Sequence, residues 1–191
     1  MSSTNAPFGM RPAFHPSGLD RATALTDGIL STYASAILKG QPVKFASTGV
    51  IQAAAAGDAF AGAFSGVEWT DTTGRRRVSN NWPANTAYQT GSCIAYFYND
   101  PNIVYEIQAA GSLAQSSIGD EADLSNVTDG STTTGLSACT LSTTLAGVGN
   151  TAQMRIINLA PYPDNAWGDN YTIVRATIAK FQFAGTAGVA V

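Results

Sequence analysis

A chain of 191 residues is long enough to bury a substantial core in one domain, so folding requires neither a disulfide nor a metal. Only 12% of its residues are charged, against ~25% in ordinary soluble proteins, and the formal net charge of −3 disfavours a nucleic-acid binder, which needs a basic surface. A surface so poor in charge is typical of proteins that partners cover, and the composition therefore favours an assembly.

Residues 1–38 differ in character from the rest of the chain. Proline and glycine interrupt the first eighteen positions, which disfavours a helix or a central strand, yet Phe8, Met10 and Phe14 are interleaved with them. Such a segment cannot bury these side chains by itself, so it has to lie against its own domain or against a neighbouring chain. We predict an extended N-terminal arm over residues 1–38 that places Phe8, Met10, Arg11 and Phe14 at an inter-subunit contact.

Residues 39–183 alternate apolar and polar side chains, are broken by turn signals every ~8–12 residues, and contain no long helical pattern. This spacing predicts an all-β domain, either a small β-barrel or a jelly-roll-like sandwich, followed by a flexible tail over residues 184–191. Phe60 and Phe64 lie four residues apart and are expected to share one face of a strand. Gly62 between them permits a sharp bend or a close backbone approach.

The strongest hairpin signal lies in the middle of the chain. The apolar run Ser92–Tyr98 is followed by a turn at residues 99–102 and by a second run, Ile103–Gln108, which we expect to pair with the first. Shortly before this hairpin, the polar stretch Asn80–Asn85 presents a single aromatic residue, Trp82. We expect Trp82 to be exposed in a loop.

Two β-branched runs near the end of the chain predict the strands that organise the fold. Met154–Leu159 and Tyr171–Phe183 flank eleven residues rich in Pro, Asp, Asn and Gly, and we expect them to pair. Neither face of the second run is purely polar, which indicates a long central strand. The loop between them carries Tyr162 and Trp167. Tyr and Trp give large contact areas at low entropic cost, so we predict that Trp82, Tyr162 and Trp167 contact another subunit.

The cysteines and the sequence ends bear on the cellular setting. Cys93 and Cys139 lie in apolar runs without the spacing of a zinc site, so we expect buried free thiols. No stretch approaches the ~20 apolar residues of a membrane-spanning helix, and the N-terminus lacks the regions of a signal peptide. We therefore expect a protein made in a cytoplasm, with no membrane partner.

The sequence predicts no catalytic residue, metal site or cofactor. His15 is the only histidine and has no sequence cue to a nucleophile. Glu68 and Glu106 lie in predicted strands and are conceivable as the paired carboxylates of a glycoside hydrolase, although such groups more often face solvent or pair with arginine. The acidic loops suit turns as well as calcium ligands, and phosphate-binding glycine motifs are absent. The run at residues 75–77, three arginines, fits a solvated hairpin edge better than a phosphate site.

Four segments carry a resemblance to a known group of proteins. They read KGQPVKFASTGVIQAAAAGDAFAGAFSGVEW, GRRRVSNNWPA, YNDPNIVYEIQA and APYPDNAWGDNYTIVRATI, and GMRPAFHPSG near the N-terminus also fits. Over roughly residues 39–181 the chain resembles tailed-bacteriophage head proteins described as structural, decoration or cement proteins. The resemblance implies a small β-domain on the outside of an icosahedral shell, commonly a trimer, that bridges capsomers against the pressure of the packaged DNA.

These observations lead to one expected function and two rivals. We expect a non-enzymatic cement protein of the virion, a homo-oligomer, commonly a trimer, that binds the major capsid protein on the outer capsid surface after assembly in the host cytoplasm. It binds neither nucleic acid nor membrane. The first rival is a glycan- or host-surface-binding β-module that uses Trp82 and Trp167, and the second is a polysaccharide hydrolase that uses Glu68 and Glu106.

Overall fold

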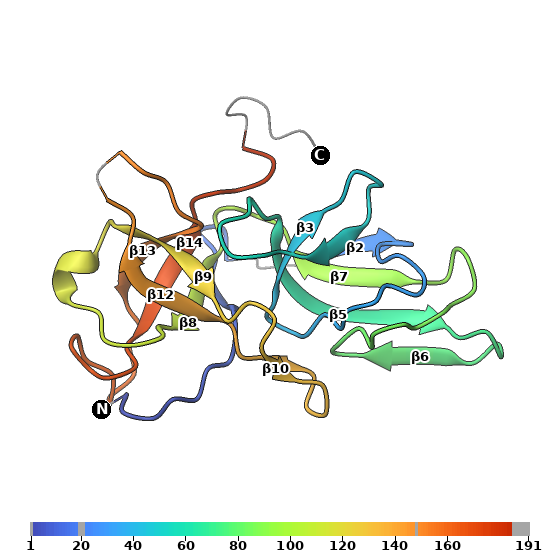
Figure 1. The fold of residues 1–191 in the computed structure, drawn as a ribbon, viewed down its shortest axis with the longest axis horizontal. Helices are drawn as coiled ribbons and strands as arrows, with labels where there is room; N and C mark the ends of the chain where they lie inside the picture. Colours follow the sequence, from blue (N-terminus) through green and yellow to red (C-terminus); the bar gives the residue numbers. More distant parts are fainter. Residues whose placement is uncertain (1, 19–21, 148, 185–191) are drawn as a thin grey trace.

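The computed structural model describes residues 2–18, 22–147 and 149–184, which form two six-stranded sheets and one two-stranded sheet (Figure 1). The only helical element among these residues is the short 3-10 turn η1, Gln115–Ser117. All strand pairs of the ladders are antiparallel. The predicted all-β class is therefore confirmed, and the sheets stay open rather than closing into a barrel, as in a sandwich.

The first six-stranded sheet, here the β8 sheet, fills one half of the molecule in Figure 1. Its strands, in spatial order, are β1 (Arg11–Phe14), β8 (Val104–Gln108), β14 (Ile173–Ile178), β13 (Met154–Leu159), β9 (Glu121–Ser125) and β12 (Thr140–Leu145). Alternate residues of β14, beginning with Val174, are buried in its core. A single bridge between Ala109 and Leu141 brings β12 back towards β8, so the sheet curls around its apolar side chains.

The second six-stranded sheet, here the β5 sheet, fills the other half (Figure 1). Its path runs β2 (Thr23–Thr26), β7 (Ile94–Tyr98), β5 (Gly62–Thr70), β3 (Pro42–Phe45) and β4 (Ile51–Ala53), with β6 (Arg76–Ser79) paired to β5. The small sheet joins β10 (Gly130–Ser131) to β11 (Leu136–Ser137). The β5 sheet has a core of its own, in which the rings of Trp69 and Trp82 meet edge to face at 5.6 Å.

The predicted hairpin in the middle of the chain is wrong. Both strands form, but β7 pairs with β2 and β5, whereas β8 pairs with β1 and β14. The turn at residues 99–102 therefore carries the chain from one sheet to the other. Turn residues indicate that the chain reverses or bends, but they do not specify with which strand the following strand pairs.

The expectation that Phe60 and Phe64 share a face is also wrong, because the chain bends between them. Phe60 packs into the core of the β8 sheet and Phe64 into that of the β5 sheet. At the bend, Gly62 has a positive φ of 156°, and a Cβ there would overlap the carbonyl group of Tyr98. The expected close backbone approach at Gly62 is thus confirmed.

The paired strands near the end of the chain are confirmed with one change of length. β13 pairs with β14, and β14 is central, between β13 and β8. β14 spans Ile173–Ile178 rather than Tyr171–Phe183, so the longest strand within the described ranges is β5, with nine residues. Both cysteines are buried and free, one in each core, as predicted.

The predicted boundary after residue 38 is corrected by the position of the first two strands. β1 is an edge strand of the β8 sheet, and β2 is an edge strand of the β5 sheet. Residues 11–14 and 23–26 thus belong to the folded body, since their backbone groups pair with those of β8 and β7. The predicted flexible tail at residues 184–191 lies outside the described residues, apart from Ala184. None of the helical segments described is long and apolar enough to cross a membrane.

Replacing Gly62 by alanine tests the bend. The added Cβ would meet backbone atoms of Tyr98, so the strands have to move apart, and we expect a loss of unfolding free energy at least about 2 kcal/mol greater than in the control. The control is Gly49→Ala, at φ 79° with no atom within 4 Å of the new Cβ. Urea unfolding of both variants measures the difference, and equal losses would contradict the proposed close approach.

Candidate functional site

A row of three charged side chains crosses three neighbouring strands of the β8 sheet. In the strand register Arg11 on β1 and Arg175 on β14 both lie directly opposite Glu106 on β8. Arg11 donates to the Glu106 carboxylate at 2.7 Å, and Arg175 donates to its other oxygen at 3.3 Å. The Glu106 side chain is only 7% exposed, so two cations compensate one nearly buried anion.

Tyr162, from the loop between β13 and β14, covers this row. Its hydroxyl donates to the Glu106 carboxylate and is also contacted by Arg11. The Arg11 guanidinium lies over the ring of Phe8 at 4.7 Å and near that of Tyr162 at 5.8 Å. The structure thus brings together three of the predicted contact residues, Phe8, Arg11 and Tyr162, around Glu106, which pairs with arginine, one of the alternatives that the sequence left open for it.

The protonation states of this cluster follow from its contacts. Burial alone would raise the pKa of Glu106, but the hydrogen bonds from Tyr162, Arg11 and Arg175 outweigh burial and hold that pKa below its ordinary value. Burial and the hydrogen bond to Glu106 raise the pKa of Tyr162, so its hydroxyl keeps the proton that it donates. The cluster therefore acts as a clamp, in which an ionised carboxylate holds β1, β14 and the Tyr162 loop together.

The segment before β1 is fastened to its own chain. The Met10 N–H donates to the Gly40 carbonyl at 2.8 Å, and a Cβ at Gly9 would lie 2.7 Å from that same carbonyl oxygen. Further towards the N-terminus, the Ser2 N–H donates to Asp169 at 2.8 Å and the Ala6 N–H to the Gln108 side chain at 3.0 Å. Of the two surfaces that the sequence left open for this segment, its own domain is the one that it occupies.

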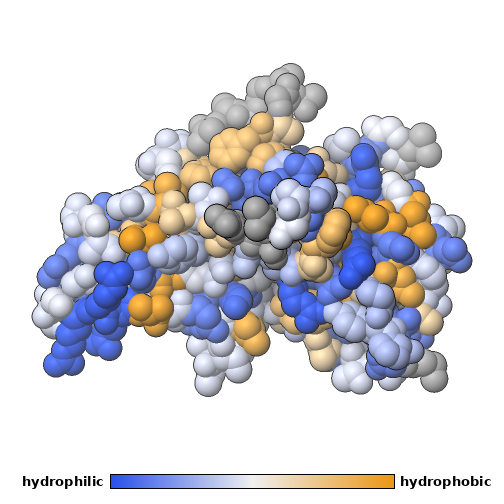
Figure 2. Space-filling model, turned by 180° about the vertical axis from the view of Figure 1, so that it is seen from behind, coloured by the Kyte–Doolittle hydropathy of each residue, from blue (hydrophilic) through white to orange (hydrophobic). Residues whose placement is uncertain are grey.

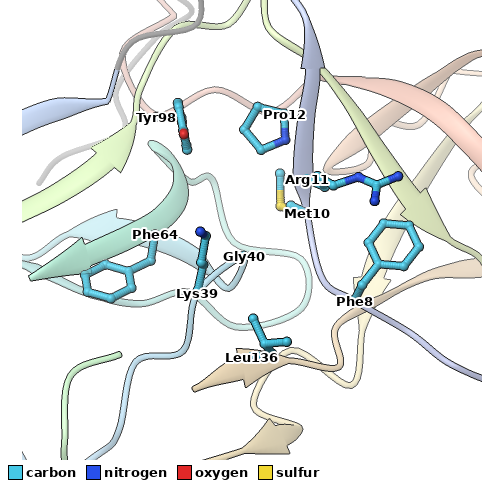
Figure 3. Close-up of a pocket in the computed structure, with 9 residues that line it drawn as sticks. All are labelled: Phe8, Met10, Arg11, Pro12, Lys39, Gly40, Phe64, Tyr98 and Leu136. Atoms are coloured by element: carbon cyan, nitrogen blue, oxygen red, sulfur yellow. The ribbon is translucent and has the colours of Figure 1, made fainter. Parts of the chain in front are cut away.

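A cavity of about 360 Å³, here the Met10 groove, lies beside the clamp at the junction of the two sheets. Most of its lining is apolar or aromatic and comes from Phe8, Met10, Pro12, Phe64, Tyr98 and Leu136. Figure 3 shows Met10 and Pro12 to the left of β1, while the Arg11 side chain extends to the right of the strand, on the side of Phe8. Successive residues of an extended segment point to opposite sides, so the same segment supplies both clamp and groove.

The other predicted contact residues lie in different surroundings. Trp82 is fully buried beneath the β5 sheet, so its predicted exposure and subunit contact are wrong. Most of its neighbours in the sequence are polar. Two backbone hydrogen bonds with Ile37, at 2.8 and 3.1 Å, nevertheless hold this segment close to the sheet, and the aromatic ring is buried in the core. Met10 is only 1% exposed, although it contributes to the lining of the groove. Trp167 is partly buried against the core of the β8 sheet, and Phe14 is 54% exposed.

Glu68 and Glu106, the conceivable carboxylate pair of a glycoside hydrolase, each pair with arginine. They belong to different sheets. Hydrogen bonds from Arg76 and Tyr96 lower the pKa of Glu68, and the pKa of Glu106 is lowered as well. The general acid of a glycoside hydrolase has a raised pKa, whereas the pKa of each of these two carboxylates is lowered.

His15 connects the end of β1 to the turn between β7 and β8. Its Nε2 lies 2.9 Å from the Asp100 carboxylate, and its Nδ1 lies 2.6 Å from the Ser17 hydroxyl. These are the residue types of a hydrolytic triad, but the Ser17 N–H also donates to Nδ1 at 3.1 Å, and the Gly18 N–H donates to the His15 carbonyl at 2.8 Å. The arrangement is a local turn that fastens β1 to Asp100. Within the described ranges, no group of three His, Cys, Asp or Glu residues could hold a metal ion.

Compared with models of known protein families, with curated proteins and with solved structures, the chain has no match in any of the three. The side chains of the clamp and the groove are therefore the features from which a function can be inferred. Sequence reasoning found Phe8, Met10 and Arg11 because large apolar residues stood in an irregular segment. It missed Lys39, Tyr98 and Leu136, since nothing local indicates that these residues meet.

The pH dependence of stability tests the clamp. Because the folded pKa of Glu106 is depressed, the stability it contributes is present above its unfolded value of about 4.5 and is lost as the pH falls through the folded value. We expect Glu106→Gln to lose about 1–3 kcal/mol at pH 7 and to show a flatter decline than the wild type below pH 5.

The matched control is Glu121→Gln, which removes a carboxylate that pairs with one arginine, Arg155, rather than two. We expect it to lose less stability at pH 7. Thermal unfolding across a pH series gives both quantities. A decline below pH 5 as steep in Glu106→Gln as in the wild type would refute the role of Glu106.

Proposed function

We propose that this protein is a non-enzymatic virion component, a cement protein on the outer surface of an icosahedral phage head that bridges capsomers. The observation that carries the proposal is the Met10 groove, a mostly apolar hollow whose lining includes three of the predicted contact residues, Phe8, Met10 and Arg11. An apolar hollow on a protein surface is the usual form of a docking site. The resemblance of residues 39–181 to phage head proteins supports the same reading.

The distribution of charge supports attachment to a large surface. Six basic side chains form ion pairs within the described part of the chain; they are Arg11, Lys44, Arg76, Arg77, Arg155 and Arg175. A partner that covers a side chain already in an ion pair pays a smaller desolvation free energy than one that covers an unpaired charge, because fewer unpaired ions lose their water. The face seen in Figure 2 carries several separate apolar patches among polar side chains. This pattern suits a subunit that folds first and then docks at a few points.

The partner in this proposal is the major capsid protein, and the protein occupies the head as a homo-oligomer, a trimer. The rival glycan-binding module is not favoured, since Trp82, one of its two proposed stacking residues, is fully buried. The rival hydrolase is not favoured either, because the two carboxylates it needs lie on different sheets.

Co-sedimentation with empty heads tests the function. The heads are assembled from the major capsid protein encoded by the same genome, and purified protein is added at increasing concentration. We expect saturable binding, and hundreds of copies per particle when purified virions are counted by mass spectrometry. A handful of copies, or sedimentation no greater than without heads, would refute a cement role. Saturable binding on a glycan array would favour the rival module instead.

A further inference from the structure

Lys39 is the cationic side chain of the Met10 groove that is not engaged elsewhere. Arg11 also borders the groove, but its guanidinium is committed to Glu106 and Tyr162. Among the described residues, Lys39 and Arg75 are the two basic side chains with neither an ion pair nor a side-chain hydrogen bond. In Figure 3 the Lys39 side chain stands between Phe64 and Tyr98 on one side and Met10 on the other.

The backbone holds Lys39 firmly in this position. Its N–H donates to the Gly135 carbonyl at 2.9 Å, and its carbonyl accepts from the Ser137 N–H at 3.0 Å. These bonds also place Leu136 opposite it, and Leu136 is 46% exposed at the edge of the groove. The groove therefore combines fixed apolar walls with one unpaired ammonium group.

The groove's size and charge restrict what can fill it. A volume of about 360 Å³ is near the lower limit of ~300–1,000 Å³ for ligand pockets and suits one or two side chains. Lys39 is exposed, and a docked segment that removes water from around its ammonium group strengthens the attraction of that group for a carboxylate. Cations and neutral polar groups gain nothing comparable there.

We propose that the Met10 groove binds an extended segment of a partner protein that inserts one bulky apolar side chain and pairs a nearby carboxylate with Lys39. Resting on the proposed function, this assigns to the capsid protein an acidic, apolar docking segment. The apolar side chain lies against Met10, Tyr98 and Leu136. The carboxylate, one or two residues away along the segment, reaches the ammonium group.

Selection from a library of random displayed peptides tests this chemistry without requiring the capsid. Against the wild-type protein we expect enrichment of peptides in which Phe, Trp, Leu or Met lies within two residues of Asp or Glu. Lys39→Glu is expected to weaken the binding of these peptides at least about tenfold, the result of replacing attraction by repulsion. Leu136→Asp, which places a second anion at the edge of the groove, is expected to weaken it as well.

Arg75→Glu is the matched control, because it makes the same change of charge at the other unengaged cation. Arg75 follows the turn between β5 and β6, which lies at the end of the molecule far from the junction of the sheets (Figure 1). We expect Arg75→Glu to bind the selected peptides like the wild type, and circular dichroism and thermal unfolding establish that all three variants fold.

Enriched peptides without the paired apolar and acidic residues, or peptides that bind Lys39→Glu as tightly as the wild type, would overturn the inference. Enrichment of segments from this chain's own sequence would also overturn it, in favour of self-association. Head binding separates the two proposals. If Lys39→Glu binds heads as well as the wild type, the groove assignment fails and the cement function stands. If the wild type selects the expected peptides but binds no heads, the cement function fails and the assignment stands.

Discussion

The arrangement of the β8 sheet depends on one nearly buried carboxylate. Burial disfavours an ionised Glu106, and the hydrogen bonds from Arg11, Arg175 and Tyr162 compensate for it. Leaving such a group without one of its partners typically costs about 1–3 kcal/mol, so each contact of the cluster matters to stability. Because its members come from β1, β14 and the Tyr162 loop, this one requirement fixes the first and last parts of the chain against the centre of the sheet.

The Met10 groove is a consequence of how the chain crosses between sheets. Tyr98 reaches it because β7 ends where the chain leaves the β5 sheet, and Phe64 reaches it because the bend at Gly62 turns its side chain away from that of Phe60. β1 lies across the same junction, with Arg11 directed to the clamp and Met10 to the groove (Figure 3). The clamp therefore stabilises one wall of the groove, and mutations in the two sites should not be additive.

Local sequence signals predicted the strands but not their partners. Alternation and turn residues identified β7, β8, β13 and β14, yet they also suggested a β7–β8 hairpin, because a turn looks the same whether the chain returns to its own sheet or enters another. For the same reason, the sequence predicted only some of the residues of the clamp and the groove. Phe8 and Arg11 stood out locally, whereas Lys39 and Leu136 acquire meaning only when distant segments meet. The prediction for Trp82 was wrong for a different reason. Its neighbours in the sequence are polar and suggested an exposed loop, whereas the tertiary fold buries its ring.

The hydrogen bonds of the first residues also impose an order on folding. Ser2 is held by Asp169, 167 positions along the chain, and Arg11 by Glu106, 95 positions along. On the ribosome, β1 is made long before either partner exists, so Phe8, Met10 and Pro12 emerge without the surface that later covers them. Contacts of such separation form slowly. The newly made chain therefore exposes an apolar stretch at least until Tyr98 and β8 have been made, and binding by a chaperone to residues 8–14 would be most useful in that interval.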